Sequence, residues 1–284
     1  MASKIMDDTT LAQATGRKIP LWPQGQTPLF EPSYGQNEPA LYPYLLKGKP
    51  AGAVIICPGG AYVRKAAHEA EPVALRFNEL GYHAFVLDYR VNPYLYPCCL
   101  LDVQRAVRMV RFHGANWGVK TDKIAVLGFS AGGHLATTTL THFDYGDADS
   151  ADPVQRVSCR PDAVLPCYAV MSMKEYAHAG SREYLLGDHP DPALLTQLSA
   201  HLNIREDTPP AFLFHTAQDQ SVPVHNTLLL GRALCERGIC CAVHVYPFGG
   251  HVMGLCYGND DRPTLAQARH WSGEAGRFLK ELGF

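Results

Sequence analysis

The sequence predicts an α/β fold, a doubly wound and mainly parallel sheet with helices on both faces. Six short apolar runs recur between residues 53 and 248, and they are nearly continuous instead of alternating with polar residues. Such runs are typical of strands buried on both faces. Longer amphipathic segments separate them, and this alternation builds parallel sheets through right-handed crossovers. With 284 residues, 46% of them hydrophobic, we expect one domain over 1–284.

The elements follow one another regularly after an irregular start. Residues 1–50 are rich in Pro, Gly and Gln, so we expect an N-terminal arm with edge strands there. The predicted strands lie at 53–57, 83–90, 123–130, 162–170, 210–219 and 241–248. The predicted helices lie at 68–80, 99–115, 131–142, 224–238 and 264–282. In the first of these helices Val73 and Phe77 lie on one apolar face, and Gly81 suits the left-handed residue that ends it.

Residues 171–209 interrupt this alternation. Gly, Pro and His are mixed there among short apolar clusters, between two predicted strands. Connections of this length inside a compact domain are usually functional covers or small inserted caps. We therefore expect a cap-like insertion before the strand at 210–219.

Charge and hydropathy exclude several classes of function. The net charge is −2, so no broad positive field is available to attract nucleic acid or an anionic membrane. No segment offers the roughly 20 apolar residues of a membrane span, and residues 1–18 have no signal-peptide core. These features favour a cytoplasmic protein with a small-molecule partner, and a homo-oligomer is compatible with them.

The nine cysteines show no metal-binding pattern. Neither CxxC pairs nor an HExxH helix occurs, and most cysteines lie in apolar runs. We interpret them as reduced, largely buried thiols, since free Cys packs as a small hydrophobe. We expect neither a metal nor another cofactor.

The first motif with a chemical meaning lies at the end of the strand 123–130. Gly128-Phe129-Ser130-Ala131-Gly132 matches GxSxG between a predicted strand and a predicted helix. In a nucleophile elbow, a strained turn exposes the serine, and small residues two positions away prevent a clash. A Gly-rich structural turn is the alternative, because the string alone is common.

Other strand ends supply the groups that a nucleophilic serine needs. A serine hydroxyl requires a histidine base, and a carboxylate must orient that histidine. Asp219 ends the strand 210–219, and His251 lies in the Gly-rich loop after the strand 241–248. The chain order Ser, Asp, His is the order found in α/β hydrolases. We therefore predict Ser130 as nucleophile, Asp219 as acid and His251 as base.

The remaining histidines and acidic residues fit less well. His244 lies inside a strand and His225 at a helix start, so both are expected to pack or cap. Glu206 and Asp207 precede the strand 210–219 and so lie at the wrong end of the sheet. His134 lies one turn into the helix after Ser130, and we interpret it as structural or supporting.

The loop Pro58-Gly59-Gly60-Ala61-Tyr62 ends the strand 53–57. In a hydrolase this loop supplies backbone donors to the oxyanion, together with the residue after the nucleophile. The predicted oxyanion hole is therefore Gly60, Ala61 and Ala131. A phosphate or dinucleotide site is disfavoured because GK[ST] and GxGxxG are both missing.

Taken together, PGGAY, LDYRV (87–91), WGVKTDKIAVLGFSAGGHLA, AQDQSVP and GGHVMGL resemble α/β-hydrolase esterases of the acetylxylan-esterase-like branch, relatives of the HGGG carboxylesterases. The resemblance covers about residues 50–257. It implies an α/β-hydrolase fold and the same roles for Ser130, Asp219 and His251. Members of this branch remove small acyl groups, typically acetyl, from sugar hydroxyls.

Two departures from the HGGG pattern bear on the substrate. Pro58 replaces its first residue and Ala61 its last glycine, which suits the acetylesterase branch better than the lipases. The implied substrate is an acetylated xylo-oligosaccharide or another short sugar ester. Tyr62, Tyr176 and Tyr184 are candidate contacts for it, with core packing as the alternative.

Three other functions compete with this one. A general short-chain carboxylesterase, lipase-like enzyme or small-peptide hydrolase would use the same residues. A non-enzymatic ligand-binding protein on a hydrolase scaffold is disfavoured because no member of the predicted triad is missing. A dinucleotide-dependent oxidoreductase is disfavoured by the missing glycine fingerprint.

Overall fold

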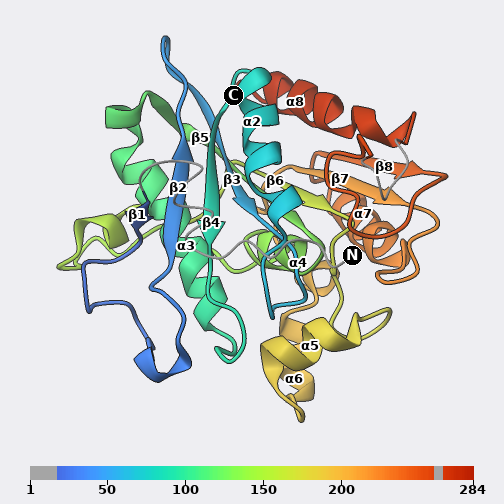
Figure 1. The fold of residues 1–284 in the computed structure, drawn as a ribbon, viewed down its shortest axis with the longest axis horizontal. Coiled ribbons are helices and arrows are strands. Elements are labelled where there is room, and N and C mark those ends of the chain that lie inside the picture. The colour runs from blue at the N-terminus through green and yellow to red at the C-terminus, as the bar shows by residue number, and fades with distance from the viewer. Residues whose placement is uncertain (1–17, 259–264) are drawn as a thin grey trace.

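The computed structural model describes residues 18–258 and 265–284. These residues form an eight-stranded sheet in the order β1-β2-β4-β3-β5-β6-β7-β8 (Figure 1). The strands are β1 (Ile19–Pro20), β2 (Ala40–Tyr44), β3 (Ala51–Cys57), β4 (His83–Asp88), β5 (Val119–Phe129), β6 (Ala163–Cys167), β7 (Ala211–Thr216) and β8 (Cys241–Tyr246). Neighbouring strands from β4 to β8 pair in parallel, whereas β1 with β2 and β2 with β4 pair antiparallel.

Helices cover both faces of this sheet (Figure 1). They are α2 (Glu71–Glu79), α3 (Cys98–His113), α4 (Ser130–Thr138), α5 (Ala179–Leu186), α6 (Pro192–Gln197), α7 (His225–Glu236) and α8 (Trp271–Glu281). Ile55 of β3 packs in one core cluster with α3, α4 and α7. Its neighbours Val54 and Ile56 pack in the other cluster with α2 and α8. The two-sided burial explains the continuous apolar runs of the inner strands, whereas the edge strand β8 exposes Val243 and Val245. The predicted fold class is confirmed.

Two predicted helices differ from the structure at their ends more than the other three. The helix expected at 131–142 ends at Thr138. The hydroxyls of Thr137, Thr138 and Thr139 each donate to the carbonyl three residues back, and such bonds compete with continued helix. The helix expected at 264–282 begins at Trp271, after a 3-10 turn at Ala268–His270; residue 264 lies outside the described residues.

The two irregular stretches of the sequence lie at the edges of this frame. β1 and β2 extend the sheet beyond β4, within the segment expected to form an arm, whose residues 1–17 lie outside the described residues. The 171–209 segment contains α5 and α6, which lie together at one end of the molecule (Figure 1). Within the described part of the chain, every helix is too short or too polar to cross a bilayer.

Crowded glycines fix the junction between β5 and α4. A Cβ at Gly128 would lie 2.1 Å from the carbonyl oxygen of Gly132. A Cβ at Gly132 would lie 2.2 Å from the carbonyl oxygen of Cys57 and 2.3 Å from that of Pro58. Because any side chain would push these backbones apart, the glycines bring the end of β3 against the start of α4.

We expect Gly132→Ala to destabilise the protein. The added methyl group meets rigid backbone, and overpacking of this kind costs about 3 kcal/mol of unfolding free energy. The matched control is Gly273→Ala in α8, where the nearest atom to the new Cβ is 4.0 Å away and alanine favours the helix. Urea unfolding measures both. Equal unfolding free energies for the two variants would show that the junction is not crowded.

Candidate active site

Ser130 occupies the sharp turn at which β5 ends and α4 begins. Its φ angle is +52°, a left-handed conformation that is strained for a residue with a side chain. The Ser130 carbonyl oxygen accepts a hydrogen bond from the N–H of Val170, at 3.1 Å, in the segment after β6. Strand, turn and helix therefore have the arrangement expected of a nucleophile elbow.

The structure brings Ser130, His251 and Asp219 together as predicted. Ser130 Oγ lies 2.7 Å from His251 Nε2, and His251 Nδ1 lies 2.6 Å from Asp219 Oδ2. An ionised carboxylate can only accept hydrogen bonds, so Nδ1 carries the imidazole proton. His251 Nε2 is then the unprotonated nitrogen that faces the serine hydroxyl and can accept its proton.

Asp219 is almost fully buried and remains ionised. Its Oδ1 accepts hydrogen bonds from the N–H groups of Ser221 and Val222, both at 2.9 Å. Burial would raise its pKa, but hydrogen bonds from His215 and His251 outweigh burial and hold the pKa well below its usual range. His215, which carries no motif, is itself buried, with Nε2 3.4 Å from Asp219 Oδ2.

The loop after β3 lies against the serine. A Cβ at Gly59 would be 3.0 Å from Ser130 Cβ, so the two backbones meet closely. Gly60 and Ala61 have φ angles of +138° and +56°. Among the described residues, the N–H groups of Gly60, Ala61 and Ala131 have no hydrogen-bond acceptor. The predicted oxyanion donors are therefore free and beside Ser130.

Tyr62 does not face this site. Its side chain is 1% exposed, and its hydroxyl lies 2.7 Å from His134 Nδ1. His134 Nε2 lies 2.9 Å from the Leu198 carbonyl oxygen, so Nε2 carries the proton and Nδ1 accepts from Tyr62. The structure thus places the Tyr62 side chain in the core, where it has no surface for a sugar ring, and His134 in a structural position.

Tyr176 and Tyr184 lie on the surface of the 171–209 segment. Tyr176 is 45% exposed and stacks on His225 with ring centroids 4.3 Å apart. Tyr184 is 36% exposed, and its carbonyl oxygen accepts from Asn92 Nδ2 at 3.3 Å. Both rings are available to a ligand, and their contact with substrate stays a prediction.

His178 lies at the start of α5 in this segment. It caps α5, because its Nδ1 accepts from the N–H of Ser181 at 3.1 Å. Burial lowers the pKa of His178, and the positive charge that His251 can carry lowers it further. The start of α5 therefore lies within electrostatic range of the candidate base.

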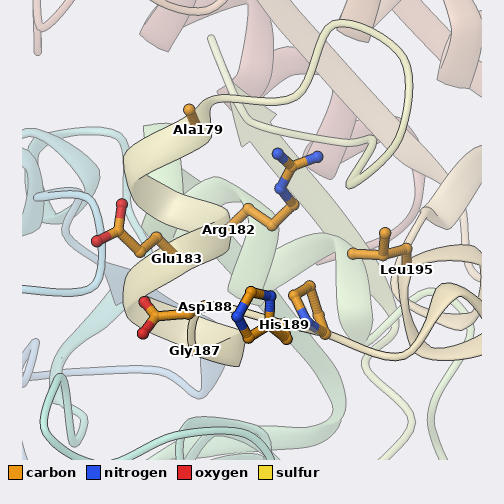
Figure 2. Close-up of a pocket in the computed structure, with 8 residues that line it drawn as sticks. Ala179, Arg182, Glu183, Gly187, Asp188, His189 and Leu195 are labelled. Atoms are coloured by element: carbon orange, nitrogen blue, oxygen red, sulfur yellow. The ribbon is translucent and has the colours of Figure 1, made fainter.

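A cavity of about 600 Å³ lies farther along the same segment, between α5 and α6. Figure 2 shows Arg182 projecting from α5 toward the side on which Leu195 lies, with His189 below it. The residues that line the cavity include Ala179, Glu183 and Asp188. Ser130, Asp219 and His251 are not among them. The cavity is thus separate from the reacting groups.

The alternative site residues occupy other places. His244 lies in β8 against Phe212, with ring centroids 4.6 Å apart, and Asp207 pairs with Arg205 before β7. Six of the nine cysteines are buried, whereas Cys235 and Cys240 are exposed and Cys241 is partly so. In the part of the chain that the structure describes, no group of three or more His, Cys, Asp or Glu has metal-binding geometry.

The burial of His134 predicts a pH dependence of stability. Burial lowers its pKa from 6.5 to about 4, whereas the unfolded chain keeps the ordinary value. Between these pH values the unfolded state binds a proton that the folded state does not. Stability therefore falls as the pH drops from about 6.5 to about 4, by about 3 kcal/mol.

His134→Gln removes the titrating group and keeps a donor for Leu198. We expect its unfolding free energy, measured in urea, to lose about 2 kcal/mol less than that of the wild type between about pH 7.5 and 4.5. Parallel pH profiles for the two proteins would contradict this account of His134.

Comparison with known proteins adds independent findings. The BD-FAE family model matches residues 41–234. The chain is 36% identical over 238 residues, 82% of its length, to endo-1,4-beta-xylanase B of Butyrivibrio fibrisolvens. It is 31% identical over 217 residues, 74% of its length, to an acetylxylan esterase of Xylanibacter ruminicola. It spans 37% and 43% of these two curated relatives.

One solved structure matches the present chain over nearly the whole length of both proteins. This is the acetyl ester-xyloside bifunctional hydrolase of Caldicellulosiruptor lactoaceticus, with a TM-score of 0.90 and 45% sequence identity. The match covers 95% of the present chain and 97% of that one.

Proposed function

The chain belongs to the BD-FAE family and has the α/β-hydrolase fold. We propose that it is a serine esterase that hydrolyses short-chain acyl esters of sugars. The observation that carries the proposal is the hydrogen-bonded series Ser130, His251, Asp219. Its first member, Ser130, lies beside a loop with free N–H groups. The family agrees with the resemblance to α/β-hydrolase esterases seen in the sequence.

The geometry suits acyl transfer in two steps. Ser130 Oγ attacks the ester carbonyl carbon while His251 Nε2 takes the hydroxyl proton. Asp219 holds the imidazole in the required tautomer and stabilises the imidazolium. The carbonyl oxygen becomes an oxyanion that accepts from the N–H groups of Gly60, Ala61 and Ala131. Each such donor contributes roughly 2.7–4 kcal/mol to transition-state stabilisation.

The first tetrahedral intermediate then breaks down, and His251 returns the proton that it took from Ser130. The C–O bond to the alcohol breaks, and His251 gives its proton to the leaving oxygen. Water attacks the acyl-serine ester, His251 accepts the proton of that water, and the second tetrahedral intermediate releases the acid and restores the Ser130 hydroxyl. The chemistry is complete with protein groups and water.

An acetylated xylo-oligosaccharide is the substrate class we propose. One relative is named an acetylxylan esterase and another an acetyl ester-xyloside bifunctional hydrolase. Tyr176 and Tyr184 supply exposed aromatic faces on the 171–209 segment, and such faces suit sugar rings. A general short-chain carboxylesterase is the second candidate, because the same residues serve any small ester and other relatives are named esterases. The cytoplasmic location stays a prediction.

Ser130→Ala tests the mechanism. We expect kcat/KM for p-nitrophenyl acetate to fall at least about 10⁴-fold, because the nucleophile is lost while the fold is kept. The matched control is Ser272→Ala in α8, a buried serine whose hydroxyl contacts Arg76 Nε at 3.2 Å, and it should keep wild-type kcat. Wild-type turnover by the Ser130 variant would overturn the proposal.

A substrate profile tests the specificity. We expect acetate release from acetylated xylo-oligosaccharides, and kcat/KM for acetyl esters at least about 10-fold above that for hexanoyl esters, since each methylene changes pocket binding by about 1–3 kcal/mol. The Ser130→Ala variant supplies the background rate. A preference for acyl chains of six or more carbons would favour the general carboxylesterase instead.

A further inference from the structure

A fully buried carboxylate lies behind the proposed oxyanion loop. Glu69, at the end of the 3-10 turn η2 (Ala67–Glu69), is 0% exposed. Its Oε2 accepts the N–H of Gly59 at 2.7 Å, and its Oε1 accepts the hydroxyl of Tyr168 at 2.7 Å. The only ion-pair neighbour among the described residues is His68, with Nε2 3.6 Å from Oε1. A carboxylate buried in this way is costly unless hydrogen bonds satisfy it.

The contact with Gly59 places this carboxylate directly at the elbow. A Cβ at Gly59 would lie 2.8 Å from Glu69 Oε2 and 3.0 Å from Ser130 Cβ. Gly59 is therefore held between the carboxylate and the serine. The next two residues, Gly60 and Ala61, carry the proposed oxyanion donors, so the bond from Gly59 to Glu69 fixes the start of that loop.

Tyr168 extends the connection to the histidine loop. It directly follows β6, and its hydroxyl donates to Glu69 and accepts the N–H of Gly254 at 2.8 Å. Gly254 lies three residues after His251. The Tyr168 ring also packs against the His251 imidazole, with centroids 5.3 Å apart and planes at 71°. Burial and the Glu69 charge raise the pKa of Tyr168, so the phenol keeps its proton as a donor.

We propose that Glu69 and Tyr168 are positioning residues that hold the oxyanion loop and the His251 loop in their relative places around Ser130. The inference rests on the proposed function. Glu69 reaches both loops at once, through Gly59 on one side and through Tyr168 and Gly254 on the other. Loss of the link lets the donors and the base move relative to the nucleophile. Displacements of about 1 Å can cost about 10²-fold in rate.

Tyr168→Phe is the direct test, because it removes the shared hydroxyl and keeps the ring. We expect kcat for p-nitrophenyl acetate to fall at least about 10-fold with KM within about 2-fold, since ground-state binding is untouched. The rate of phosphonylation by a fluorophosphonate should fall in parallel, because that reaction uses the same nucleophile, base and donors. Tyr82→Phe is the matched control: its buried hydroxyl donates to the Gly276 carbonyl at 2.8 Å, and kcat should not change.

Stability measurements separate positioning from simple support of the fold. Both rates are measured at least 20 °C below the Tm of each variant. A Tyr168→Phe protein with a lowered Tm but wild-type kcat and phosphonylation rate would show a structural role only and overturn the inference. If the variant fails to fold, Glu69→Gln, which keeps the side-chain size and one acceptor oxygen, replaces it with the same expected loss of kcat.

The double variant tests whether the two residues act as one unit. Because Glu69 reaches the His251 loop through Tyr168, we expect Glu69→Gln to lower kcat less in the Tyr168→Phe background than in the wild type. Fully additive losses would contradict the link. A wild-type protein without ester turnover or phosphonylation would refute the proposed function and the inference with it. An active wild type with an equally active Tyr168→Phe would refute the inference alone.

Discussion

The left-handed backbone of Ser130 is the constraint on which the site depends. With φ at +52°, the chain turns sharply from β5 into α4. Packing and hydrogen bonds from neighbouring segments stabilise this strained turn. Gly132 packs without a side chain against the carbonyls of Cys57 and Pro58, and the Ser130 carbonyl oxygen accepts the N–H of Val170. The turn thus joins the ends of β3, β5 and β6, and the strain in one residue is offset by packing in three strands.

Around that turn, burial and hydrogen bonding decide which groups are charged. Asp219 is ionised because four donors meet it: two backbone N–H groups and two histidines. His134 is kept neutral by burial, which outweighs the hydrogen bond that one ring nitrogen donates to the Leu198 carbonyl oxygen. Among the described residues, His251 is the imidazole whose unprotonated Nε2 faces the serine hydroxyl.

Much of this arrangement is predictable from sequence, because each strand and the residue that follows it are encoded in one short stretch of the chain. Continuous apolar runs identify β3 to β8, and the residues that follow β5, β7 and β8 include Ser130, Asp219 and His251. Helix ends are less predictable, since the threonine hydroxyls near the end of α4 act through side-chain hydrogen bonds. The Tyr62 side chain is buried with its hydroxyl against His134, and loop composition does not encode that direction. Glu69 and Tyr168 are 99 residues apart, so only the folded chain brings them together.

The most direct test of the account is where a phosphonate attaches. Treatment with a fluorophosphonate, followed by peptide mapping and a crystal structure of the adduct, locates the reactive atom. We predict a single bond to Ser130 Oγ, with the phosphonyl oxygen accepting from the N–H groups of Gly60, Ala61 and Ala131. An adduct on another residue, or no adduct under conditions that label a known serine esterase, would contradict the assignment of Ser130 as nucleophile.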